Sequence, residues 1–246
     1  MNIAASIAAA LLTTSSLAHA APPIDLSPIP AERGALNLPP HWQHGVFMEV
    51  FVRAYQDSDG DGIGDLKGLI SRLDHLQELG IRGLWLMPIQ ANADGDHGYA
   101  TRDFRAVAPE YGTLGDFDAL LREAAQRGIG VIIDYVVNHS ARSHPLFERS
   151  AADPRDRFRP WYVWREEAPT GWDIWGKDPW TTTANGAYFA TFGPHMPDFD
   201  LRNPNKVRSL VGVFAGQNPV QFHRIDGEGY RFLADMVVRL NGPNPQ

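Results

Sequence analysis

The chain has 246 residues, with 22 Lys and Arg against 29 Asp and Glu, so its formal net charge is -7. It has no cysteine, which excludes disulfide frameworks and Cys-ligated metal centres. The acidic balance argues against a nucleic-acid-binding protein, which would present a basic surface. Hydrophobic residues make up 43% of the sequence, which is typical of a globular protein with a core.

The amino terminus resembles a secretory signal peptide. Residues 1–20 (MNIAASIAAALLTTSSLAHA) run from small and apolar residues to an Ala-His-Ala end. The first basic residue is Arg33, so the usual positive start is missing, and a disordered leader is the alternative. The segment is too short and too polar after Leu12 to span a membrane. The sequence predicts a periplasmic or secreted protein with no membrane span, in which residues 21–44 form a proline-rich lead-in.

Three strands are predicted between residues 45 and 139. Residues 46–52 (VFMEVFV) and 83–87 (GLWLM) are β-branched, aromatic or apolar runs of strand length. Residues 130–137 (GVIIDYVV) are almost continuously apolar, which indicates a strand buried on both faces.

Two helices are predicted between these strands. Apolar residues at helical spacing run from Leu66 to Leu79, and Gly80 follows where a C-terminal cap belongs. Thr113 and Asp116 have the spacing of a capping box, so a second helix should begin there and end at Gly128. The order strand, helix, strand, helix, strand indicates a parallel α/β fold.

Residues 140–200 interrupt this alternation of strands and helices. They are rich in Pro, Trp, Arg and Asp and show no sustained hydrophobic periodicity. Five tryptophans lie here, and we expect most of them to form the core of a small irregular domain instead of stacking on sugars. The alternation resumes in residues 201–246, with a strand predicted at 221–225 and a helix at 229–240.

The sharpest local pattern is the loop of residues 57–65 (DSDGDGIGD). Aspartates at alternate positions with intervening glycines resemble the first half of an EF-hand calcium loop. The twelfth position is Gly68 instead of Glu, and a strand precedes the loop where an EF-hand has a helix. A solvated acidic turn is the alternative, but we expect a Ca2+ site whose ligands are Asp57, Asp59, Asp61, Ile63 and Asp65.

Polar motifs follow the second and third predicted strands. Residues 96–99 (DHGY) lie in the loop after the second strand, and residues 134–139 (DYVVNH) run off the end of the third. In parallel α/β folds these strand ends build the active site. Taken singly, His139 would more often be a structural histidine, Asp134 a buried hydrogen-bonded carboxylate, and Asp96 and Tyr99 ordinary loop residues.

Together these motifs resemble the α-amylase superfamily of glycoside hydrolases. The resemblance is carried by residues 46–88, 96–111, 130–139 and 196–200 (MPDFD). It implies a (β/α)8 TIM barrel with an irregular domain inserted after strand 3, here residues 140–200. It also implies a retaining mechanism on α-glucosidic bonds.

The resemblance also assigns roles by position. Tyr99 would stack on the sugar whose bond is cut, Asp96 would accept its hydroxyls, and His139 would hydrogen-bond the same ring. Residues 222–226 (FHRID) keep the last three positions of the fourth-strand motif, so Arg224 would orient the nucleophile and Asp226 would be the nucleophile. Phe222 and His223 replace the motif's glycine and aromatic residue.

The general-acid Glu and the later His-Asp pair of the family have no counterpart in this chain. Glu228 is two residues from Asp226, but its flanking glycines disfavour it as a substitute. Without leader, lead-in and insertion, roughly 145 residues remain, against about 250 for a full barrel, which is material for four to five βα units. We therefore expect an amino-terminal portion, truncated in residues 201–246 and inactive alone.

The expected function of the family member is hydrolysis of α-1,4-glucosidic bonds in starch or maltooligosaccharides. Two alternatives stay open: a non-catalytic calcium- and sugar-binding remnant, and an oligo-α-glucosidase or transglycosylase. An incomplete barrel would also leave an open sheet edge, so self-association through that edge is expected.

Overall fold

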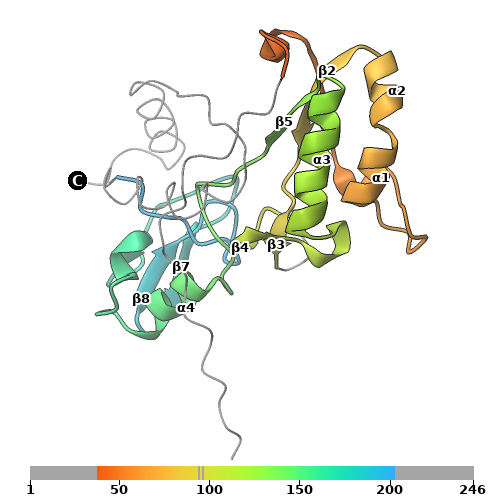
Figure 1. Ribbon diagram of the computed structural model, residues 1–246. Helices are drawn as coiled ribbons and strands as arrows, with labels where there is room; N and C mark the ends of the chain where they lie inside the picture. Colours follow the sequence, from red (N-terminus) through yellow and green to blue (C-terminus); the bar gives the residue numbers. More distant parts are fainter. Residues whose placement is uncertain (1–37, 94, 96, 203–246) are drawn as a thin grey trace, which may run out of the picture.

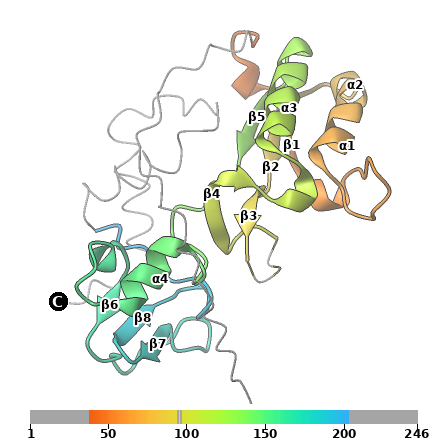
Figure 2. The same ribbon diagram turned by 60° about the horizontal axis from the view of Figure 1, so that its bottom comes forward.

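The computed structural model describes residues 38–202, except residues 94 and 96 (Figure 1). The elements form two groups, a parallel sheet covered by helices and a smaller antiparallel sheet with one helix. A short strand pair lies between the groups in both Figure 1 and Figure 2. The predicted signal peptide and lead-in up to residue 37, and the elements predicted beyond residue 202, lie outside the described residues.

The parallel sheet has three strands in the order β1 (Val46–Val50), β2 (Ile81–Leu86) and β5 (Gly130–Ile133). Both neighbouring pairs are parallel, which confirms the predicted arrangement. Helices α1 (Leu66–Ser71), α2 (Leu73–Glu78) and α3 (Leu114–Gln126) lie along one face of this sheet (Figure 1).

The two faces of the parallel sheet differ in burial. Val50, Leu86 and Ile133 are in register and pack toward the helices in the larger hydrophobic core. Val50 and Leu86 are fully buried, and each such aliphatic side chain contributes about 1.5–3 kcal/mol. On the opposite face, Glu49 is exposed and its neighbour Trp85 is 44% exposed, so this face is open in the described part of the chain.

The capping box that begins α3 is confirmed. The Thr113 hydroxyl accepts a hydrogen bond from the Asp116 N–H at 3.2 Å, and the Asp116 carboxylate accepts one from the Thr113 N–H at 2.8 Å. The helix is followed by Gly128 with φ of 68°, and α2 by Gly80 with φ of 81°. These left-handed positions suit glycine and end the helices as predicted.

Four predicted element boundaries are wrong. Strand β2 runs from Ile81 to Leu86 instead of over residues 83–87. The first predicted helix is two helices, α1 and α2, which part at Arg72, and Leu79 is exposed instead of turned inward. Strand β1 stops at Val50 and gives way to a 3-10 turn at Val52–Ala54. Strand β5 stops at Ile133, and its last three residues are only half-buried, because within the described residues one neighbour strand pairs with it.

An antiparallel pair that the sequence did not predict follows β2. Strands β3 (Gln90–Asn92) and β4 (Thr101–Val107) pair with shifts in register, and a 3-10 turn at Pro109–Tyr111 leads to α3. Another 3-10 turn, Trp42–His44, precedes β1. The β3–β4 pair brackets the loop that carries Tyr99.

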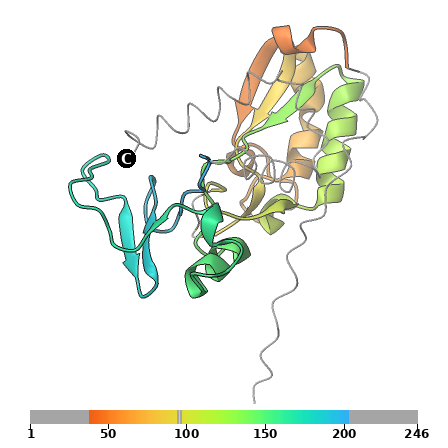
Figure 3. The same cartoon turned by 90° about the vertical axis from the view of Figure 1, so that its left-hand side faces the viewer.

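The segment expected to be irregular contains regular structure. Helix α4 (Pro145–Ala152) and a 3-10 turn at Arg159–Trp161 precede a three-stranded sheet. Its order is β6 (Trp164–Arg165), β8 (Gly186–Phe189) and β7 (Trp180–Thr183), all antiparallel (Figure 2). The view in Figure 3 shows this sheet apart from the parallel sheet. Aromatic residues fill its core, and Phe147 contacts the rings of Tyr162, Trp164 and Tyr188.

The core interpretation of the tryptophans is confirmed for four of the five. Trp161, Trp164 and Trp172 pack against the clusters of this region, and Trp180 is 8% exposed. Trp175 is the exception at 75% exposed. None of the helices in the described ranges is long and apolar enough to cross a membrane.

Candidate active site

The first site residue stands where β5 ends. The Asp134 N–H donates to the Leu86 carbonyl at 2.7 Å, so Asp134 extends the pairing with β2 by one residue. Its carboxylate accepts a hydrogen bond from the Tyr99 hydroxyl at 3.3 Å. Burial raises the pKa of Asp134, the Tyr99 bond opposes this, and the nearby charge of Glu49 adds to it.

Tyr99 is held by its backbone as well as by its hydroxyl. Gly98 has φ of 110°, and a Cβ there would lie 2.6 Å from the Pro88 Cβ, so only glycine fits. The Tyr99 carbonyl lies 3.1 Å from Nε2 of His139. Two residues that follow β5, Asp134 and His139, thus hold one tyrosine of the loop between β3 and β4.

His139 is buried with only 4% of its surface exposed. Its Nε2 faces a carbonyl and must donate, so Nδ1 is left to accept from the Asn138 amide at 3.3 Å. Burial lowers the pKa of His139 to about 4, which the bond to Tyr99 partly opposes. The ring is therefore neutral at pH 7 and both nitrogens are engaged within the protein.

A second carboxylate, that of Asp198, connects this site to the small sheet of β6, β8 and β7. Asp198 is fully buried and accepts hydrogen bonds from the Thr191 hydroxyl at 2.6 Å and the Thr191 N–H at 3.1 Å. Its backbone bridges to His139, and the next residue donates to the Asn138 carbonyl at 2.8 Å. Burial raises the pKa of Asp198 to about 7.

Phe192, next to Thr191, places its ring against the site. Its centroid lies 5.2 Å from that of His139, and 47% of its surface is exposed. The sequence analysis placed Asp134 in a motif at a strand end and Asp198 in the motif of residues 196–200, but it assigned neither of them a role at the site, and it did not name Phe192. Alternation along residues 130–134 could have found Asp134, because it points to the same face as Ile132. Asp198 carried a signal through the motif of residues 196–200, whereas Phe192 carries none, because its place depends on tertiary pairing.

The structure brings together two of the residues that the sequence analysis assigned to the site. Tyr99 and His139 are in contact, as expected from their places after neighbouring strands. Asp96, Arg224 and Asp226 lie outside the described residues. Their roles stay predictions.

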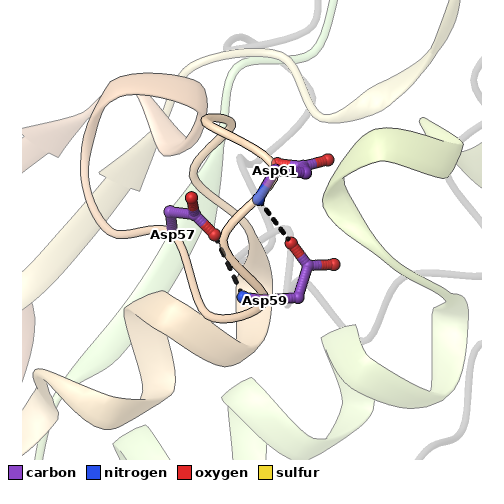
Figure 4. Close-up of side chains that lie close together, drawn as sticks. All are labelled: Asp57, Asp59 and Asp61. Carbon is purple, nitrogen blue, oxygen red and sulfur yellow. Dashed lines mark hydrogen bonds between the residues drawn. The ribbon is translucent and has the colours of Figure 1, made fainter.

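The acidic loop lies away from this cluster, between β1 and α1. Oxygen atoms of Asp57, Asp59 and Asp61 all lie within 4.8 Å of one another (Figure 4). Backbone N–H groups of Gly60 and Gly62 donate to Asp57, and these bonds lower the pKa of its carboxyl group. A cation bound to oxygen ligands at about 2.4 Å spans ligand pairs of this separation, so the three carboxylates fit Ca2+.

The other two predicted ligands are placed differently. The Asp65 carboxylate caps α1 by accepting from the Gly68 N–H at 2.8 Å, and it also accepts from the Ser58 N–H at 2.8 Å. The Ile63 N–H donates to Asp61 at 2.7 Å. The structure thus gathers three of the five predicted ligands into one group.

Comparison with known proteins shows the family. The model of the α-amylase catalytic domain matches residues 49–232. Alpha-amylase 3 of Dictyoglomus thermophilum is 43% identical over 72% of this chain and 34% of its own length. An α-glucosidase of Pediococcus pentosaceus is 40% identical over 69% of this chain and 32% of its own length.

A solved structure agrees with the sequence relatives. A mutant of isomaltulose synthase from Erwinia rhapontici NX5, in complex with its natural substrate sucrose, is 34% identical with a TM-score of 0.67. The match covers 72% of this chain and 33% of that one. The chain thus spans about a third of the length of these relatives. It belongs to the α-amylase catalytic-domain family, and its parallel sheet is part of a TIM barrel.

Proposed function

We propose that this chain carries the sugar-binding side of an α-glycosidase active site. The observation that supports this best is the Tyr99–Asp134 hydrogen bond at the carboxyl ends of parallel barrel strands. This is the edge at which TIM barrels build their active sites. Half-buried Tyr99 offers a ring face to a pyranose, whose C–H groups pack well on aromatic surfaces.

The proposed reaction is retaining hydrolysis of α-1,4-glucosidic bonds in starch or maltooligosaccharides. Asp226 would attack the anomeric carbon, Arg224 would orient Asp226, and Asp96 would accept sugar hydroxyls. His139, which is buried with both ring nitrogens engaged, would support the same sugar ring by holding the Tyr99 backbone. A second carboxyl group about 5–5.5 Å from the nucleophile is needed to protonate the leaving oxygen.

Further proposals concern the rest of the chain. Residues 140–200 would be a domain inserted after the third barrel strand, which the separate aromatic core of this region supports.

The protein would be exported by its leader to the periplasm or medium. Self-association would occur through an open sheet edge, which is supported by β5 having one neighbour strand within the described residues, and size-exclusion chromatography is the direct measurement.

Sugar binding by the whole chain tests the function. We expect maltose and maltotriose to bind in isothermal titration calorimetry, and Tyr99→Ala to weaken binding about tenfold or more, because the stacking face is lost. Tyr99→Phe keeps the ring and is expected to bind more tightly than Tyr99→Ala. Unchanged melting curves for both variants would show that the fold is intact.

Release of reducing sugar from soluble starch separates the alternatives. Hydrolysis by the chain would establish the glycosidase function for this polypeptide. Binding without hydrolysis would favour the non-catalytic alternative, in which the chain binds calcium and sugar only. If no α-glucoside binds at all, the proposal is wrong.

We also propose that the loop of residues 57–65 binds Ca2+. The convergence of Asp57, Asp59 and Asp61 supports this, and Ile63 and Asp65 would complete the ligands. The bound ion would fix the connection between β1 and α1 by neutralising clustered carboxylates.

Calcium should raise the thermal stability of the chain. At a hundredfold excess over Kd we expect Tm to rise by roughly 5 °C or more, because the ion binds the folded state only. Asp59→Ala should lose this rise, whereas Asp118→Ala, on α3 outside the group, should keep it. Identical melting curves with calcium and with chelator in the wild-type chain would contradict the assignment.

A further inference from the structure

A groove lies along helix α4, outside the candidate active site. Its volume is about 930 Å3, at the upper end of the range for small-molecule sites. The residues before α4 and the helix itself supply most of its lining, and Pro194 and His195, which follow β8, supply the rest. Arg142, Glu148 and Pro194 are exposed, so the groove is open to solvent.

The protein holds this groove in shape. Phe147 lines it and is 2% exposed, with its ring centroid 4.9 Å from that of Tyr188. The Tyr188 hydroxyl donates to the Pro194 carbonyl at 2.7 Å, and the Arg142 N–H donates to the His195 carbonyl at 2.8 Å. The lining segments are thus fixed to each other before a ligand arrives, which lowers the entropic cost of binding.

Three polar side chains of the groove are not engaged by the protein. In the part of the chain that the structure describes, no ion pair involves Arg142 or Glu148. The Ser143 hydroxyl is buried, and it has no hydrogen-bond partner within the described ranges. A buried hydroxyl without a partner is destabilising, and a change of rotamer would let it bond a ligand in the groove. The groove therefore offers a cation, an anion and a hydroxyl that are all uncommitted.

The charges of the groove select a neutral ligand. Glu148 opposes an anion and Arg142 opposes a cation. The start of α4 does not favour an anion either, because Pro145 has no N–H and the Leu146 N–H donates to Nδ1 of His144 at 3.1 Å. A guanidinium with five donors beside a carboxylate with two acceptor oxygens matches the neighbouring hydroxyls of a sugar.

Backbone pairing joins the groove to the candidate site. His139 bridges to Asp198, and Arg142 donates to the His195 carbonyl, so the same two segments pair at both places. The three residues from His139 to Arg142 span at most about 11 Å. A sugar chain held in the groove would therefore have a raised effective concentration at the site.

We propose that the groove binds a glucosyl segment of an α-glucan as a second, non-catalytic site. This inference rests on the proposed function, because the ligand class is the proposed substrate. Arg142, Ser143 and Glu148 would bond sugar hydroxyls, and Ala151 and Pro194 would pack against pyranose C–H groups.

Calorimetric titration of maltotriose into the whole chain counts the sites. We expect two sites per wild-type chain. Arg142→Met keeps the side-chain length without the charge, and it should weaken the groove site about tenfold or more while the other Kd changes less than about twofold. Arg155→Met is the matched control, because Arg155 is exposed and lies outside the groove, and it should bind as the wild type does. Tyr99→Ala should weaken the other site and leave the groove site unchanged.

Inorganic phosphate is the probe for an anion site in the same groove. We expect phosphate neither to bind nor to displace maltotriose. Glu148→Gln should weaken maltotriose binding in the groove about three- to tenfold, because hydrogen bonds to a neutral amide are weaker than those to a carboxylate. Phosphate binding that tightens in Glu148→Gln, with no sugar held in the groove, would overturn the proposal.

The remaining outcomes separate the groove from the proposed function. If Tyr99→Ala removes all maltotriose binding and Arg142→Met removes none, the groove is no sugar site while the proposed function stands. If Arg142→Met loses its site and Tyr99→Ala changes nothing, the groove stands and the site at Tyr99 is wrong. If maltotriose does not bind the wild type, both are wrong. A lower Tm of Arg142→Met with unchanged sugar affinities would show a structural role for Arg142 and count against the groove.

Discussion

Replacing Asp198 with alanine is expected to lower the free energy of unfolding by about 3 kcal/mol at pH 5. At that pH the side chain is neutral, since its pKa is raised to about 7, so no relief of a buried charge offsets the loss. The substitution leaves the Thr191 hydroxyl and N–H without their acceptor in a fully buried place. Urea unfolding of both proteins at pH 5 measures the difference.

A double-mutant cycle with Thr191→Val isolates the interaction. We expect a coupling energy of at least about 1 kcal/mol, because the two side chains are in direct contact. Asp153→Ala is the matched control, since that carboxylate is half-exposed and pairs with a solvent-exposed Arg155. Equal effects of Asp198→Ala and Asp153→Ala would show that the buried bonds add nothing.

The hydrogen bonds of Asp198 also help to position the residues of the site. Asp198 joins the end of β5 to the small sheet, since its N–H donates to Phe189 and its carbonyl accepts from Val163. Thr191 precedes Phe192, the ring beside His139. Weakening the Asp198 bonds should therefore loosen Phe192 relative to His139.

The barrel part of the fold could be predicted from sequence because its signals are local. The capping box at Thr113, the glycines after α2 and α3 and the apolar runs of the strands each act within a few residues. Parallel pairing followed from the alternation of these elements. Tyr99 and His139 could be brought together for the same reason, because both follow parallel strands.

The small sheet could not be predicted, because its strands are short and its register depends on contacts distant in sequence. Strand β6 has only two residues, and β7 and β8 have four each. Helix α4 did carry a signal that was overlooked, since His144 caps it and Pro145 begins it. The motif of residues 196–200 drew attention to Asp198, but its burial and its bonds to Thr191 depend on the fold.

The pH dependence of stability should differ sharply between the wild type and Asp198→Asn. Burial lowers the pKa of His139 to about 4 and of His144 to about 3, whereas the unfolded value is near 6.5. The stability linked to each histidine is present above pH 6.5 and is lost as pH falls. Between pH 7 and 4 the two together cost about 6 kcal/mol.

Asp198 acts in the opposite direction. Its folded pKa is above the unfolded value, so its folded state binds the proton more tightly and stability is lost as pH rises toward 7. Lowering pH from 7 to 4 therefore returns about 3 kcal/mol. These three groups leave the wild type with a net loss of about 3 kcal/mol, and Asp198→Asn with about 6 kcal/mol, since asparagine mimics the neutral acid without titrating.

Denaturant unfolding at pH 7, 6, 5 and 4 measures both profiles. His144→Asn is the control for the acid limb, because asparagine can still accept the Leu146 N–H that His144 accepts at 3.1 Å but cannot titrate. The His144→Asn variant should reduce the loss of stability between pH 7 and 4 by about 3 kcal/mol. Parallel pH profiles for the wild type and Asp198→Asn would mean that Asp198 does not change its charge in this range. In that case the opposing effects of the two buried histidines and of Asp198 would not determine how the free energy of unfolding depends on pH.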